Sequence, residues 1–199
     1  MRAPWIALAA ALAMVAGGCT PGDAGGGGGG TGTGDDDVGI VSLDADCADA
    51  DRAPTERGDD RFRAAVLCLV NAERDVRGLA TLEPRDPLTE AAQVHADDMA
   101  ARGYFAHNAP DGADVADRAR GAGYSRRGVG RWQVGENLGY VSGGRTTPRR
   151  LMRGWMESPG HRRNLLQPAH RDAGIGVTRG SPGQGRPPGV IAVQVFGRR

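Results

Sequence analysis

The sequence predicts a single α+β domain, and the order of its segments leads to that class. Four segments with the apolar spacing of amphipathic helices come first, and strand-like segments close the chain. Helices followed by a few antiparallel strands are typical of α+β folds and not of alternating α/β folds. The chain has 199 residues, enough for one domain of ordinary size, which we place at residues 58–199.

Two long helices are predicted from start and stop residues around apolar stripes. Asp59 or Asp60 can cap the first helix, and Gly78 is placed to end it. The second helix opens with Asp86 as its cap, followed by a proline at the first helical position, and Gly103 stops it. The faces predicted to be buried are Phe62, Val66, Leu69 and Val70 in the first helix, and Leu88, Ala91, Ala92, His95 and Met99 in the second.

The remaining elements are shorter. Residues 113–122 form an Ala-rich segment that predicts a third helix, and Thr147 followed by proline opens a fourth, with Trp155 turned inward as a core residue. Strands are predicted at residues 173–177 and 190–196, with a third at 134–141. The two closing strands are separated by a loop rich in Gly and Pro, which suits a long hairpin.

The first 19 residues indicate export. Arg2 precedes an apolar stretch over residues 5–15, and small residues at 16–18 lead directly to Cys19. This resembles the lipobox of bacterial lipoproteins, in which the cysteine carries a lipid, although Ala16 stands where Leu is usual. The alternative is a plain secretory signal with Cys19 incidental. No apolar run reaches eighteen residues, so we expect no membrane-spanning helix.

The cysteines fit an oxidising compartment. Three cysteines leave one without a partner, and if Cys19 is acylated then Cys47 and Cys68 remain to pair. By loop-closure entropy a bridge over that spacing would stabilise the fold by about 3 kcal/mol. Two buried free thiols are the alternative.

Residues 20–57 are predicted to be a flexible tether, because Gly25 to Gly30 is an unbroken glycine run followed by acidic residues. Charge divides with the domain boundary: residues 20–60 hold eleven acidic residues and two Arg, whereas residues 61–199 hold 22 Arg and 13 acidic residues. A basic domain can meet anionic lipid headgroups, acidic glycans or its own acidic arm. Nucleic acid is a poor partner for an exported chain, and no motif for it occurs.

Several motifs, in this order, resemble those of the CAP superfamily, whose domain is also called SCP, and its short bacterial branch in particular. The resemblance covers residues 61–197 and implies an α-β-α sandwich with a small antiparallel sheet between helical layers. The motifs are Cys68-Leu-Val-Asn-Ala-Glu-Arg, Asp97-Asp-Met-Ala, Tyr104-Phe-Ala-His, Pro110-Asp-Gly, Asp117-Arg, Gly123-Tyr, Gly135-Glu-Asn-Leu, Trp155-Met-Glu-Ser-Pro-Gly-His-Arg-Arg-Asn-Leu-Leu and Gly174-Ile-Gly-Val.

The resemblance also implies a cleft with two His and two Glu. His107 and His161 match the two His and Glu136 matches the first Glu, but Ser158 stands where the second Glu is expected, with Glu157 one residue earlier. Two imidazoles and a carboxylate suit zinc or another divalent cation with an open position for water. They equally suit a structural polar cluster.

Other polar residues are interpreted as structural. Asn137 and Asn164 are expected to brace turns and support the cleft, and His95 to be a packed core histidine. His170, which follows Pro168, is expected to face solvent. Asp117 and Arg118 are expected to pair, with Arg118 bracing the loop before Glu136. No Gly-x-Ser-x-Gly motif occurs, which disfavours a serine nucleophile.

Three hypotheses of function follow. The leading one is a tethered extracytoplasmic binding module for a hydrophobic ligand, such as a lipid or sterol-like molecule, or for a cell-wall component, held at the His/Glu cleft. It rests on the family resemblance, in which several members are thought to bind lipids or sterols. The alternatives are a metal-dependent hydrolase, peptidase-like, that uses the same cleft, and a protein-interaction scaffold.

Overall fold

The computed structural model describes residues 39–125, 131–144, 146–183 and 185–199. Cys19, the export signal and the first part of the expected tether therefore lie outside the described residues. Within the described part, no helix is long and apolar enough to cross a membrane.

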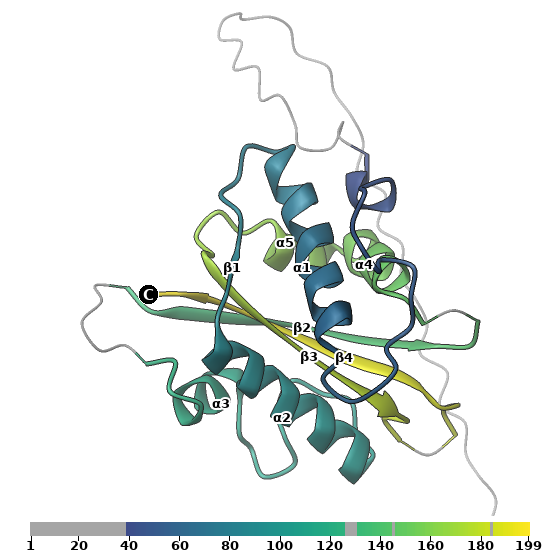
Figure 1. The fold of residues 1–199 in the computed structure, drawn as a ribbon. Helices are drawn as coiled ribbons and strands as arrows, with labels where there is room; N and C mark the ends of the chain where they lie inside the picture. The colour runs from purple at the N-terminus through teal and green to yellow at the C-terminus, as the bar shows by residue number, and fades with distance from the viewer. Residues whose placement is uncertain (1–38, 126–130, 145, 184) are drawn as a thin grey trace, which may run out of the picture. The chain divides into compact units, whose positions relative to one another are not determined.

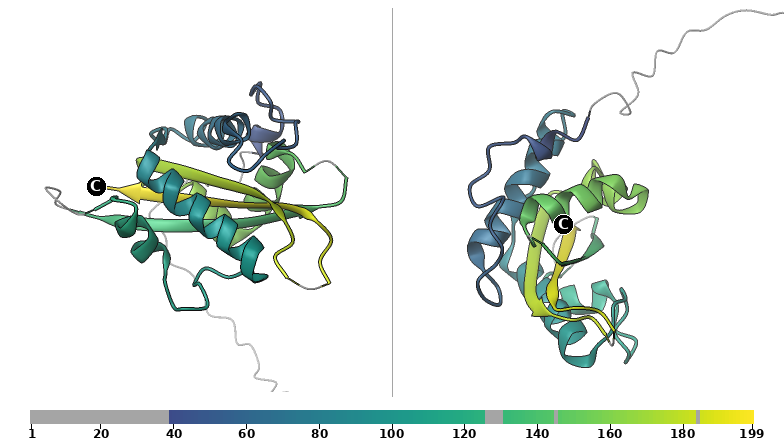
Figure 2. Two further views of the ribbon diagram at one scale, coloured as in Figure 1. Left: turned by 60° about the horizontal axis from the view of Figure 1, so that its bottom comes forward. Right: turned by 90° about the vertical axis from the view of Figure 1, so that its right-hand side faces the viewer.

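A four-stranded sheet lies between two layers of helices (Figures 1 and 2), which is the α-β-α sandwich that the family resemblance implied. The strands follow the order β1-β3-β4-β2, so that β2 forms one edge. The strands are β1 (Glu83–Pro84), β2 (Gln133–Ser142), β3 (Asp172–Gly180) and β4 (Gly189–Arg198), and the helices are α1 (Asp60–Asp75), α2 (Asp86–Arg102), α3 (Val115–Gly121), α4 (Pro148–Glu157) and α5 (Pro159–Leu165).

The sheet is mixed and not purely antiparallel. β4 pairs antiparallel with both β2 and β3, whereas the two-residue β1, absent from the predicted elements, runs parallel to β3. Glycines in β3 allow α2 to lie directly on the sheet: a Cβ at Gly174 would stand 2.1 Å from the main chain of Leu88, and one at Gly176 would stand 2.3 Å from that of Ala92. The Gly-x-Gly spacing of this strand is thus a packing requirement.

The helix boundaries follow the predicted caps, with one correction. The Asp59 carboxylate accepts hydrogen bonds from the main chain of residues 61 and 62, and the Thr147 hydroxyl accepts one from residue 150. Gly103 closes α2 in the left-handed conformation, with φ at 67°. The cap of α2, however, is Arg85 and not Asp86, which is the first helical residue and places its acidic charge in the first turn.

Apolar side chains fill both faces of the sheet. On one face, β4 residues at even positions pack with α1, α4 and α5, and Trp155 is 2 % exposed there, as predicted for a core residue. On the other face, the odd positions of β4 pack with α2 and α3. This alternation places consecutive residues of a strand in different cores.

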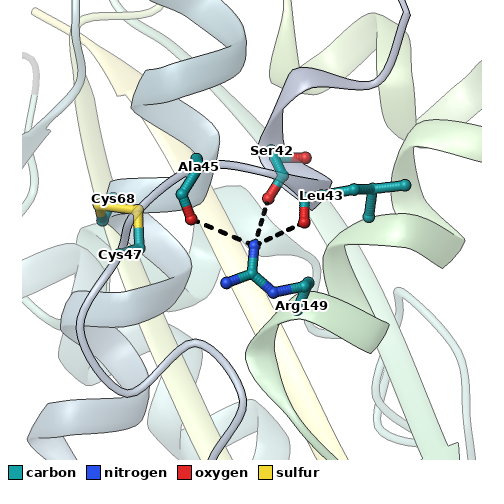
Figure 3. The surroundings of a disulfide bond; sticks show 6 residues. All are labelled: Ser42, Leu43, Ala45, Cys47, Cys68 and Arg149. Carbon is teal, nitrogen blue, oxygen red and sulfur yellow. Dashed lines mark hydrogen bonds between the residues drawn. A yellow bond between two sulfur atoms is a disulfide. The ribbon is translucent and has the colours of Figure 1, made fainter.

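Residues 39–57 pack on the domain, so the described domain begins earlier than the predicted residue 58. The disulfide between Cys47 and Cys68 joins this segment to α1, as the cysteine count predicted. A 3-10 helix, η2 (Val41–Leu43), follows residue 40, and the Arg149 guanidinium donates to the carbonyls of Ser42, Leu43 and Ala45 (Figure 3). Tertiary hydrogen bonds of this kind override a composition that predicts a tether.

His170 is buried, which corrects the expectation that it faces solvent. Its ring is stacked on Phe196 with centroids 5.0 Å apart, and the residue is 2 % exposed. Its Nδ1 lies 3.2 Å from the Asn164 carbonyl oxygen. Burial lowers the pKa of His170 to about 4, because the imidazolium form would lose its hydration.

Candidate functional site

Glu136 of β2 is the centre of the polar cluster, because both of its carboxylate oxygens are engaged. Oε1 lies 2.8 Å from His107 Nδ1, and Oε2 accepts a hydrogen bond of 2.7 Å from Arg118. The Glu136 side chain is only 2 % exposed, and that of Arg118 is 8 % exposed. A buried carboxylate is stable here because a guanidinium neutralises it.

His107 lies in the loop between α2 and α3, and Arg118 fixes that loop. The Arg118 guanidinium donates to the carbonyl oxygens of His107 and Ala113 in addition to Glu136. Arg118 therefore binds Glu136 directly, instead of pairing with Asp117 as expected. Asp117 completes the capping box of α3 and pairs with Arg120.

The hydrogen bond to Glu136 determines the chemistry of His107. A carboxylate only accepts, so Nδ1 carries the proton and the neutral ring keeps its lone pair on Nε2. The side chain is 59 % exposed. The pKa of His107 is raised, chiefly by this hydrogen bond and against the opposing effect of burial. His107 is thus an oriented imidazole able to accept or donate a proton at its outer nitrogen.

His95 lies behind Glu136 and is buried, as predicted. Its Nε2 is 3.0 Å from the Ala106 carbonyl oxygen and 3.9 Å from Glu136 Oε1. The Tyr104 hydroxyl lies 3.4 Å from Nδ1 and donates to Asp98. Burial lowers the pKa of His95 more than the nearby carboxylate raises it, so His95 enters the cluster as a neutral ring.

His161 enters from α5, on the other side of β2. Its Nδ1 is buried and has no hydrogen-bond partner among the described residues. Burial lowers the pKa of His161, and the nearby charge of His107 lowers it further. A proton on one ring therefore opposes a proton on the other.

Asn137 and Asn164 connect α5 to β2. Asn137 Nδ2 donates to the main-chain oxygen of His161 at 3.0 Å. Asn164 Nδ2 lies 3.1 Å from the Glu136 carbonyl oxygen and 2.9 Å from Asn137 Oδ1. These amides position the strand and the helix that carry the His and Glu side chains.

The side chains considered as metal ligands do not form a ligand set in the described residues. Among the described residues, no three His, Cys, Asp or Glu side chains converge as metal ligands. Each oxygen of Glu136 accepts a hydrogen bond, one from His107 and one from Arg118. Glu157, considered as the second carboxylate, is exposed and lines a separate depression with Met156 and Arg163. The described residues therefore offer no set of three side-chain ligands for a divalent cation.

A groove of about 490 Å³ extends from His161 along β2. Phe105, two residues before His107, forms one wall with Arg186, and α4 forms the other. No feature of the sequence marked this groove, since Arg186 lies in a Gly/Pro-rich loop and Gly154 within a predicted helix. The lining residues are Phe105, Leu138, Gly139, Tyr140, Val141, Ser142, Arg150, Leu151, Gly154, Trp155, His161 and Arg186.

The comparisons agree with this fold. Residues 67–196 match the model of the CAP family, described as the cysteine-rich secretory protein family, and the chain belongs to that family. His107, Glu136 and His161 all lie within the matched span.

A curated relative is the uncharacterized protein YkwD of Bacillus subtilis (strain 168), 32% identical over 115 residues, which are 58% of this chain and 42% of the relative. The chain thus matches less than half the length of that relative. Among solved structures, an extracellular SCP-domain protein of Bacillus anthracis str. Ames has a TM-score of 0.55 at 22% identity, covering 70% of this chain and 43% of that one. An outer surface protein of Borrelia burgdorferi has a TM-score of 0.54 at 18% identity, covering 67% of this chain and 90% of that one. At these identities the structures are evidence for the fold.

Proposed function

We propose that this CAP protein is an exported binding module, tethered to the cell envelope, that holds an amphipathic ligand in the groove beside His161. The observation that carries the proposal is the groove itself, which combines aromatic and aliphatic walls with an imidazole at one end. Ligand sites are typically apolar concavities with a few oriented polar groups. His107 lies two residues after Phe105 along the chain and is close enough to His161 for its charge to lower the pKa of that ring.

Export is supported by the sequence of residues 1–19 and by the disulfide, since such bonds persist in oxidising compartments. The names of two structures with the same fold, an extracellular protein and an outer surface protein, point the same way. A lipid on Cys19 would keep the module at the membrane surface. The ligand is then a component of the envelope or of its surroundings.

The metal-dependent hydrolase receives no such support. Its carboxylate would have to be Glu136, whose oxygens are committed to His107 and Arg118. The scaffold hypothesis leaves the groove without a role. Binding is therefore the function that the geometry favours.

The test uses the full chain and the fluorescent probe 8-anilinonaphthalene-1-sulfonate, which joins an apolar ring system to an anionic group. Gly154→Trp fills the groove from α4, where an added Cβ meets no atom within 4 Å. Gly121→Trp is the control, because Gly121 also faces open space but lies on α3. We expect saturable binding that weakens at least tenfold in Gly154→Trp and is unchanged in Gly121→Trp. Equal binding by all three proteins would refute the groove as the site.

A further inference from the structure

The edge strand β2 presents main-chain groups away from the sheet at every second residue. Its pairing with β4 is continuous from Gln133 to Ser142, so the alternation is regular along its length. The carbonyls of Glu136 and Leu138 accept hydrogen bonds from side chains outside the sheet, which identifies the even positions as the outward ones. By the same alternation, the N–H and C=O groups of Tyr140 also point outward.

The protein covers only the first half of this edge. Asn164 takes the Glu136 carbonyl, and Trp155 Nε1 takes the Leu138 carbonyl at 2.9 Å. From Tyr140 onward, the described residues supply no hydrogen bond to the outward main chain, and β2 changes from buried to half-buried. Natural proteins usually block an exposed edge, because it is a template for pairing with another chain.

The uncovered half, residues 140–142, forms part of the floor of the groove. Residues 138–142 all line it, between the α4 wall and the wall made by Phe105 and Arg186. The Arg186 guanidinium is held over the rings of Phe105 and Tyr140, at 5.6 Å and 5.7 Å from their centroids. The edge is thus recessed between two walls and not presented flat.

We propose that the groove receives an extended peptide, which adds to β2 as a fifth strand opposite residues 140–142 and directs a carboxylate toward Arg150 or Arg186. This inference rests on the proposed function and names its ligand class. Strand addition is an established mode of peptide recognition, in which main-chain hydrogen bonds provide affinity and flanking pockets provide selectivity. Four residues of such a strand span about 13 Å.

The charge of the groove selects an acidic peptide. Its lining contains two Arg and a His but no Asp or Glu. Neither Arg150 nor Arg186 forms a salt bridge with any acidic side chain of the described residues: Arg150 donates to the Gly143 carbonyl, and Arg186 lies over aromatic rings. A guanidinium without an acidic partner at the rim can pair with a ligand carboxylate at little desolvation cost.

The walls argue against a second copy of the chain as the occupant. A β2 edge from another molecule would bring its own α4 and Phe105 walls, which would meet those of the first molecule before the strands could pair. A peptide with no flanking structure avoids this conflict. The occupant is therefore a single extended segment.

The experiment measures binding of the fluorescein-labelled peptide Val-Thr-Val-Thr-Val-Asp to the full chain by fluorescence anisotropy. Two isomers carry N-methyl groups on alternate amides, one on the odd and the other on the even positions. Only one alternating set of amides in a bound strand faces β2. We therefore expect one isomer to lose at least tenfold in affinity and the other to bind within about threefold of the parent, since each main-chain hydrogen bond contributes about 1 kcal/mol.

The variants then locate the site. Gly154→Trp is expected to abolish peptide binding and Gly121→Trp to leave it unchanged. Arg186→Gln is expected to lower the affinity for the parent peptide about fivefold. It should not change the affinity for a version of the peptide that ends in Asn amide.

Two outcomes would overturn the inference: both methylated isomers binding like the parent, or no peptide binding while the anilinonaphthalene probe still binds. The second would leave the proposed function standing. If neither probe binds, both proposals fail.

Discussion

His107 and His170 lie against consecutive residues of β2, but on opposite faces of the sheet and in different surroundings. His107 contacts Glu136 on the face that carries α2 and α3 and keeps one nitrogen toward solvent. His170 lies against Gly135, where an added Cβ would stand 3.3 Å from its ring, on the face that carries α5. One ring has a carboxylate and a raised pKa, and the other has an aromatic stack and a lowered pKa. The period of two in a strand thus separates a reactive histidine from a structural one.

The largest expected effect comes from removing Arg118, the cation that neutralises the buried Glu136 beside His107. Arg118→Met leaves the buried Glu136 carboxylate with only His107, so we expect the free energy of unfolding to fall by about 3–5 kcal/mol. The positive charge of Arg118 lowers the pKa of His107, so that pKa should rise in the variant. Urea unfolding and NMR titration measure the two effects.

Arg120→Met is the matched control on the same helix, since among the described residues the one salt bridge of Arg120 is to the exposed Asp117, and its guanidinium otherwise lies over the Trp132 ring. Its cost should stay within about 1 kcal/mol. A stability loss equal to that of Arg118→Met would show that the helix, and not the buried pair, had been disturbed.

A smaller effect separates the two histidines themselves. His170→Ala removes a buried stacked ring and should cost about 2–4 kcal/mol, as for other large core side chains. His107→Ala removes a side chain that is 59 % exposed and should cost less than about 1 kcal/mol. Thermal unfolding of the two variants would contradict the comparison if the order of the losses were reversed.

The smallest effect concerns pH. The folded-state pKa of His170 is about 4, below its usual 6.5, so between these values the unfolded chain binds more protons. Stability from this residue is therefore complete above pH 6.5 and declines on acidification, by about 1.5 kcal/mol between pH 6.5 and pH 5. His170→Phe keeps the stack on Phe196 and should remove that part of the pH dependence. The free energy of unfolding of both proteins, measured in urea at pH 6.5 and pH 5, checks this. An equal loss of stability in His170→Phe and in the unsubstituted protein would contradict the prediction.

Local signals predicted the helix boundaries, and the cysteine count predicted the disulfide. Gly103 and Thr147 act at the ends of helices because their conformational and hydrogen-bonding preferences are local. Long-range contacts were not predictable in the same way. The burial of His170 depends on Phe196, a strand residue 26 positions later, and β1 is two residues long and has no periodicity to detect.

The sequence motifs named residues of the polar cluster, but they did not predict the hydrogen bonds between its side chains. The motifs named His107, Glu136 and His161, because family resemblance preserves residue types in order. They did not show that Arg118 would bind the second oxygen of Glu136. That contact depends on how α3 packs beside β2, and the sequence of α3 alone suggested a neighbouring pair with Asp117.

The disulfide would have a mechanical consequence if the protein is held at its N-terminal end, as proposed above. A pull applied through residue 39 would first detach residues 39–46, which are held by hydrogen bonds and packing, and would release about 27 Å of chain at 3.4 Å per residue. The load would then pass through the Cys47–Cys68 bond directly into the middle of α1. Residues 48–67, which contain the cap of that helix, lie inside the covalent loop and would carry no tension.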